Sequence, residues 1–204
     1  ASAAYQTEGS TEADGRGRSI WDEFAARPGA IIDGSDATTA CDSYRRYTED
    51  ADLVAGAGLK AYRFSIAWPR IFPDGAGALN EAGVDYYSRL VDALLDRGVS
   101  PFATLFHWDL PLALQEKGGW AARDTALRLA DYAAAITARL GDRVKNFIVL
   151  NEAAVHAVLG HVLGAHAPGP NDPALLGPVL HHLNLGQGLS TAPMRAAQGG
   201  LSLR

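Results

Sequence analysis

Cysteine is almost missing from this sequence: Cys41 is the single one in 204 residues. One cysteine excludes an intrachain disulfide and a cysteine-based zinc site within these residues. It fits a reducing compartment, so we expect a cytoplasmic location. Cys41 itself is expected to be a small buried hydrophobe.

Long apolar runs and basic stretches are also missing. No run approaches the roughly 20 apolar residues of a membrane span, and no basic segment precedes an apolar stretch as in a signal peptide. The chain begins with Ala1 rather than Met, so an N-terminal piece is expected to be missing. Its 18 Lys and Arg are outnumbered by 23 Asp and Glu. Without a basic stripe, neither nucleic acid nor a membrane is an expected partner.

Two common cofactor motifs do not occur. No Gly-x-Gly-x-x-Gly follows an expected strand, and there is no Gly-Lys-Ser/Thr phosphate loop. The adjacent pair His181-His182 does not indicate a metal, because neighbouring residues on a helix face different ways. We therefore expect no cofactor and no metal.

What the sequence does contain is an alternation of short apolar runs and amphipathic stretches. Runs typical of strands occupy residues 1–6, 59–65, 101–106 and 147–151. Between the later runs, two stretches repeat apolar residues every three or four positions, which predicts helices with one core-facing stripe. The stripes are Val84, Tyr87, Val91 and Leu94, and Leu129, Ala133, Ile136 and Leu140.

Several polar residues predict where helices begin. Ser19, with Asp22 and Glu23 behind it, is expected to cap a short helix, and Thr48 and Asn80 are expected to open two longer ones. A last helix is expected over residues 175–197, weakened by two glycines and a proline inside it.

Alternating strands and helices imply a parallel sheet with helices outside. A doubly wound sheet and a barrel both satisfy this pattern. Polar residues stand at or next to the strand ends, where parallel sheets and barrels hold their sites: Gln6, Arg63, His107, Trp108, Asn151 and Glu152. A (β/α)8 barrel gathers such groups on one rim and needs about 250 residues, so four units in this chain would make half of one.

This set of groups suits a polyhydroxylated ligand. Amide and imidazole groups donate and accept as hydroxyls do, and the face of Trp108 matches the C–H side of a sugar ring. Cleavage of a glycosidic bond requires a pair of carboxyl groups, one of them protonated with a raised pKa. Glu152 is the candidate for that acid, and Asn151 is placed to hydrogen-bond the 2-hydroxyl of the sugar.

Five stretches together resemble the family-one glycoside hydrolases, the family of β-glucosidases and β-galactosidases, in order and spacing over essentially the whole chain. They are Ala4-Tyr5-Gln6-Thr7-Glu8-Gly9, Gly15-Arg16-Gly17-Arg18-Ser19-Ile20-Trp21-Asp22, Tyr62 to Pro73, Phe106-His107-Trp108-Asp109-Leu110-Pro111, and Asn151-Glu152 followed by Gly160 to Gly169.

The resemblance implies a (β/α)8 TIM barrel and a retaining mechanism, with the two carboxyl groups about 5–5.5 Å apart. By the same resemblance Glu152 is the general acid/base, and Arg63 pairs with the nucleophilic carboxylate and keeps it ionised. The hydroxyl-binding groups of the sugar subsite are Gln6, His107 and Asn151, with the indole of Trp108 beside them.

The chain departs from the family in what it lacks. The family nucleophile lies in a Thr-Glu-Asn-Gly motif, which does not occur here. We therefore interpret residues 1–204 as one partial barrel domain, the N-terminal half, whose expected partners are a small saccharide or β-glycoside and the missing C-terminal half-barrel. Ala153 and Ala154 replace a family Pro and Trp, which trims the wall near the leaving group. The tail Leu185 to Arg204 fits the family pattern poorly.

Other interpretations remain open. Glu152 as a structural carboxylate, Arg63 as a salt-bridge partner and His107 as a core histidine are the plain alternatives. At the level of the whole chain, the alternatives to a glycosidase half are a truncated, non-catalytic paralogue that binds sugar or a partner through its open sheet edge, and a fragment that does not fold. The sequence does not choose among glucose, galactose and fucose.

Overall fold

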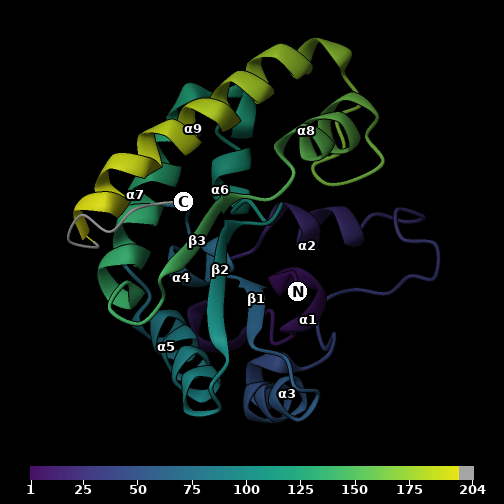
Figure 1. Cartoon of the computed structure of the whole chain (residues 1–204). Helices are drawn as coiled ribbons and strands as arrows, with labels where there is room; N and C mark the ends of the chain where they lie inside the picture. Colours follow the sequence, from purple (N-terminus) through teal and green to yellow (C-terminus); the bar gives the residue numbers. More distant parts are fainter. Residues whose placement is uncertain (198–204) are drawn as a thin grey trace.

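The computed structural model describes residues 1–197, and its centre is a parallel sheet of three strands. They are β1 (Ala61–Ser65), β2 (Ser100–Phe106) and β3 (Asn146–Leu150), side by side in that order (Figure 1). Arg63 is paired with Phe102, and Phe102 with Asn146. Strand order that follows chain order in one direction is what an arc of a barrel needs, whereas a doubly wound sheet reverses it.

Each parallel crossover contains a long helix, as parallel strands require. Helix α5 (Glu81–Asp96) lies between β1 and β2, and α7 (Arg123–Leu140) lies between β2 and β3. The other helices are α1 (Ala4–Thr7), α2 (Ile20–Ala25), α3 (Ser43–Gly56), α4 (Trp68–Ile71), α6 (Leu112–Gln115), α8 (Ala153–Val155), which continues into a π-helical segment (His156–Val162), and α9 (Leu176–Ala197); single 3₁₀ turns cover Ala13–Gly15, Gly119–Ala121 and Pro173–Leu175.

The two predicted helix stripes are confirmed. All four stripe residues of α5 and all four of α7 are buried, and they pack into one core with the strands. Asn80 is the N-cap residue of α5, as expected. Ser19 caps α2 with a reciprocal pair of hydrogen bonds to Asp22, a capping box.

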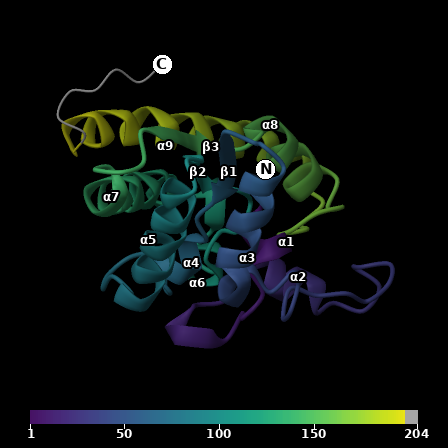
Figure 2. The same ribbon diagram turned by 60° about the horizontal axis from the view of Figure 1, so that its bottom comes forward.

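Helix α9 confirms the last predicted helix and packs mainly along α7 (Figures 1 and 2). One of its glycines has a packing role that the sequence did not show. A Cβ at Gly186 would lie 3.0 Å from Leu129 Cδ2 and 3.4 Å from Ala126 Cα on α7. The missing side chain therefore allows the two helices to approach closely, and the helix propensity lost at Gly186 is offset by contact.

The predicted strand over residues 1–6 is wrong. Ser2 N donates to Arg63 O at 2.9 Å, so the first residues run beside β1, but the chain then turns into the one-turn helix α1. The turn satisfies its own backbone, with Gln6 N donating to Ala3 O, and Ala4 N donates to the hydroxyl of Ser65 at 2.7 Å. The described residues thus contain three strands rather than four.

Two smaller expectations are also wrong. Helix α3 begins at Ser43, after Asp42 in a left-handed conformation (φ 55°), and not at Thr48. Cys41 is exposed, because the loop that carries it lies at the surface before α3. Among residues 1–197, no helix is long and apolar enough to cross a membrane.

Candidate active site

The side chain of Arg63, from the middle of β1, reaches Asn151, the residue after the end of β3. From β1, Arg63 Nη2 donates to Asn151 Oδ1 at 2.6 Å, and its Nε donates to Thr104 Oγ1 on β2 at 2.9 Å. The guanidinium thereby links all three strands. Because the amide oxygen of Asn151 is held by Arg63, its Nδ2 is turned the other way.

That Nδ2 group faces Glu152, donating to Oε2 at 3.4 Å. The backbone of Asn151 extends the sheet ladder by donating to Phe106 O, and its side chain is buried. Glu152, one residue later, is exposed and has a left-handed backbone (φ 45°, ψ 58°). The chain therefore changes direction at Glu152, and the exposed carboxyl of this residue is accessible to a ligand.

Trp108 is the second rim residue in the left-handed region, with φ 75°. Its indole N–H donates to Asn151 O at 2.8 Å. Its ring lies 6.1 Å from that of His156, in a nearly parallel arrangement, and 5.6 Å from that of His166. Such backbone strain costs of order 1–3 kcal/mol per residue and clusters at functional sites. Two adjacent strand ends carrying it support the choice of this rim as the site.

A cavity of about 500 Å³ lies beside Trp108. Three of the predicted site residues line it, namely Gln6, His107 and Trp108, whereas Arg63, Asn151 and Glu152 do not. The structure thus divides the predicted residues into two groups. Trp108 connects them, because its ring lines the cavity while its N–H binds Asn151.

Sequence reasoning missed three aromatic residues of the cavity wall. Tyr5 stacks on Trp21 with ring centroids 5.7 Å apart, and Trp21 lies 5.5 Å from the ring of His166. Tyr5 and Trp21 stand inside two of the stretches quoted above, and His166 in a third. The signal was therefore present, but nothing in the sequence places these three segments around one cavity.

His107 is held neutral. Burial lowers its pKa to about 4, and the positive charge of Arg63 acts in the same direction against a smaller opposing effect of Glu152. No described residue is a hydrogen-bond partner of its buried Nδ1. A neutral imidazole both donates and accepts, so it suits the hydroxyl groups of a sugar.

Asp109 follows Trp108 and is a further residue that the sequence did not single out. It is 1% exposed, and no side chain of the described residues donates to its carboxyl. Burial, and next the negative charge of Glu8, raise the pKa of Asp109 to about 7. The segment after β2 therefore carries, next to Trp108, a buried carboxyl group that changes charge near neutral pH.

Within residues 1–197, no cluster of three or more His, Cys, Asp or Glu side chains is arranged to hold a metal ion. The histidines around Trp108 serve as ring contacts. His156 is buried, and its burial, with His161 next, lowers its pKa well below the ordinary value, so it packs as a neutral ring.

Comparison with known proteins gives consistent results. The model of the family "Glycosyl hydrolase family 1" matches residues 1–198. Beta-glucosidase A of Thermotoga maritima is 50% identical over 183 residues, which are 90% of this chain and 41% of the relative. Thermostable beta-glucosidase B of Thermobispora bispora is 52% identical over 203 residues, which are 100% of this chain and 42% of that protein.

Solved structures similar to this chain belong to the same family. The family 1 b-glucosidase from Thermotoga maritima superimposes with a TM-score of 0.95 at 46% identity, covering 97% of this chain and 46% of that one. The beta-glucosidase from Thermotoga maritima in complex with glucoimidazole superimposes with a TM-score of 0.94 at 47% identity, covering 96% of this chain and 44% of that one. The chain thus spans somewhat less than half the length of the relatives it matches.

The match to residue 198 also corrects one expectation. The family model extends over residues 185–198, and of these residues 185–197 belong to α9. The rest of that tail, to Arg204, lies outside the described residues.

Proposed function

This chain belongs to glycosyl hydrolase family 1, whose solved members are TIM barrels, and from that premise we propose that it is the N-terminal half of a retaining β-glycosidase. The proposed substrates are terminal β-linked glucose or galactose in oligosaccharides or glycosides. The observation that carries the proposal is the contact set Arg63–Asn151–Glu152 at the end of β3. The relatives reported above are named beta-glucosidases, which supports glucose as the substrate sugar.

In this proposal Glu152 is the general acid/base. Its exposed carboxyl protonates the glycosidic oxygen as the bond to the anomeric carbon breaks, and a nucleophilic carboxylate attacks that carbon from the opposite face. Glu152, now ionised, then removes a proton from the water that hydrolyses the glycosyl-enzyme. The nucleophile is a Glu outside these 204 residues, since no Thr-Glu-Asn-Gly motif occurs among them.

Arg63 has two roles in the proposal. Its charge favours the ionised form of the nucleophile that the other half supplies. Its hydrogen bond to Asn151 Oδ1 fixes the amide so that Nδ2 is the group presented to the 2-hydroxyl of the sugar. That contact strengthens in the transition state.

The sugar subsite of the proposal lies over Gln6, His107 and Trp108, the residues that share the cavity. The neutral ring of His107 and the amide of Gln6 bind hydroxyls, and the indole of Trp108 carries the apolar face of the ring. The proposal places the enzyme in the cytoplasm, for which the single cysteine is the support.

Complementation tests the proposal. The chain alone should not hydrolyse a chromogenic β-glucoside, and mixing it with a C-terminal half-barrel of a relative should restore turnover. Glu152→Gln in the mixture should lower the rate roughly 10²- to 10⁴-fold, the usual contribution of a general acid/base. Glu49→Gln, which changes another exposed carboxyl, on α3, should leave the rate unchanged. No turnover after complementation, or full activity of Glu152→Gln, would refute the proposal.

A second candidate is a non-catalytic, sugar-binding protein. It is favoured by the cavity, which is lined by Gln6, His107 and Trp108 without any other chain. Calorimetry of the chain alone with glucose and with deoxynojirimycin distinguishes the two. Binding without turnover, even after complementation, supports the second candidate.

A further inference from the structure

Gln6 lies on a helix that is too short to hold its own position. Helix α1 has four residues, and a single helical turn is unstable in isolation. The side chain of Gln6 is exposed at the cavity rather than packed in the core. Its placement must therefore come from the residues that tie down the two ends of α1.

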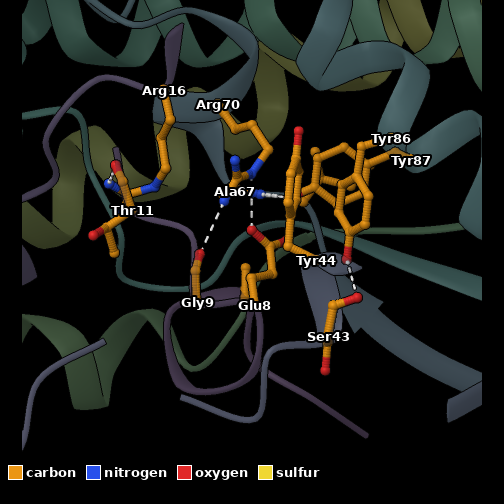
Figure 3. Close-up of polar contacts among 12 residues, drawn as sticks. Glu8, Gly9, Thr11, Arg16, Ser43, Tyr44, Ala67, Arg70, Tyr86 and Tyr87 are labelled. Atoms are coloured by element: carbon orange, nitrogen blue, oxygen red, sulfur yellow. Dashed lines mark hydrogen bonds and ion pairs between the residues drawn. The ribbon is translucent and has the colours of Figure 1, made fainter. Parts of the chain in front are cut away.

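The N-terminal end is attached to β1 by hydrogen bonds from Ser2 N to Arg63 O and from Ala4 N to Ser65 Oγ. The C-terminal end is held by buried side chains, through Glu8 (Figure 3). Arg70 Nε donates to Glu8 Oε2 at 3.0 Å, and both side chains are almost fully buried. The hydroxyl of Tyr87 donates to the other carboxylate oxygen of Glu8.

These contacts connect α1 to α3, α4, α5 and the segment that follows β1. Arg70 belongs to α4 and also donates to Gly9 O at 3.3 Å. Tyr87 belongs to α5, and its hydroxyl accepts from Ala67 N at 2.7 Å, just beyond the end of β1. The guanidinium of Arg70 lies 4.1 Å from the ring centre of Tyr44 on α3, which fixes its plane.

The backbone next to Glu8 allows no adjustment. Gly9 has φ 67°, and a Cβ there would lie 2.2 Å from Thr39 O. Glu8 O in turn accepts from Tyr44 N at 3.0 Å. The segment after Gln6 is thus fixed in both direction and register.

We propose that Glu8, Arg70 and Tyr87 are positioning residues for the sugar subsite, because their buried contacts set where Gln6 lies relative to the end of β1. The inference rests on the proposed role of Gln6 and names residues that do not touch the sugar. A buried ion pair is weak evidence for stability, since apolar replacements of such pairs are often neutral. Here the ion pair matters because it fixes an orientation. One carboxylate oxygen of Glu8 binds Arg70 and the other binds Tyr87, which specifies a single orientation of the side chain, whereas an apolar contact would allow several.

Hydrogen exchange of the chain alone tests the positioning directly, without any sugar. Glu8→Gln keeps the volume and removes the charge, and Tyr87→Phe removes one hydrogen bond at nearly constant volume. Both should speed exchange of the Gln6 and Glu8 amides at least about tenfold, with the amides of α7 unchanged, because local opening is governed by local contacts. Glu81→Gln, which breaks the exposed pair with Arg139, is the matched control and should change neither.

Unchanged exchange at Gln6 and Glu8 in both variants would overturn the inference. That outcome is independent of catalysis, so it is distinct from failure of the proposed function. If Glu8→Gln does not fold, Tyr87→Phe decides.

A double-mutant cycle in the complemented barrel tests the link to the sugar. With Gln6 present, Glu8→Gln should weaken deoxynojirimycin binding roughly tenfold. In a Gln6→Ala background the same change should weaken binding less than about twofold, because the effects of residues that act through one another are non-additive. Equal losses in both backgrounds would show that Glu8 acts by general destabilisation and would overturn the inference. If the complemented barrel binds no inhibitor, the exchange experiment alone decides.

Discussion

Replacing Asp109 by Asn should stabilise the chain at neutral and alkaline pH. Asp109 is 1% exposed, and burial with the nearby charge of Glu8 raises its pKa to about 7. Backbone N–H groups of Asp109 and His107 and the positive charge of Arg16 oppose this rise in pKa without cancelling it. Asn is close in size and stays neutral at every pH, so the variant isolates the cost of the charge.

The magnitude follows from the pKa difference. An unfolded Asp has a pKa of about 3.9, so the shift is about three units, and at 1.36 kcal/mol per unit the charged form costs about 4 kcal/mol. The folded pKa is the higher one, so the folded state binds the proton more tightly. The associated stability is fully present below about pH 4 and is lost as pH rises from about 4 to 7.

Urea denaturation at several pH values measures this effect. The free energies of unfolding of the two proteins should agree near pH 4 and diverge to about 4 kcal/mol in favour of Asp109→Asn at pH 8. Such a gain is a large fraction of the 5–15 kcal/mol typical of a domain. A difference independent of pH, or a variant less stable at pH 8, would refute this account of the buried carboxyl.

Three further predictions use other parts of the chain. Burial and the charge of Arg63 lower the pKa of His107 to about 4, so the neutral ring contributes stability that should be lost as pH falls from about 6.5 to 4. His107→Gln should remove this pH dependence of the unfolding free energy, measured by urea denaturation. Arg63→Met should raise the pKa of His107, measured by its ring proton shifts in NMR titration; an unchanged value would contradict the assigned charge effect. Gly186→Leu should lower the free energy of unfolding by about 1–3 kcal/mol, because the side chain separates α9 from α7. Gly188→Ala should raise it by up to about 1 kcal/mol, because a Cβ there meets nothing within 4 Å. Similar effects at both sites would contradict the close-packing role of Gly186.

The sequence predicts the local features of this fold well. The stripes of α5 and α7, the cap at Ser19 and the later strands depend on spacing within one segment, which the sequence shows directly. A parallel sheet was also predicted, because alternating elements leave few other topologies. The choice of a barrel over a doubly wound sheet came from the family resemblance and not from the alternation.

The errors arise where contacts distant in the chain decide the outcome. Residues 1–6 have an apolar start typical of a strand, but Ser65 Oγ and the Glu8–Arg70 pair turn them into α1. Gly186 counts against a helix in any local scale, and only its closeness to Leu129 explains it.

The candidate site shows the same division. Arg63, Asn151 and Glu152 were identified from their strand ends, and Arg63 and Asn151 do meet. Trp21, on α2, and His166, in the loop after the π-helical segment, were missed because the sequence does not place them near Gln6. The catalytic and binding roles of Arg63, Asn151 and Glu152 are predictions that experiment has to test.

The central claim is that Glu152 supplies the proton to the leaving group. The most direct test compares two β-glucosides in the complemented barrel, one with a poor alkyl leaving group and one with 2,4-dinitrophenolate, which leaves without a proton. In the first, bond-breaking step, Glu152→Gln should slow the alkyl glucoside roughly 10²- to 10⁴-fold and the dinitrophenyl glucoside far less. Equal losses for both substrates would contradict the role assigned to Glu152.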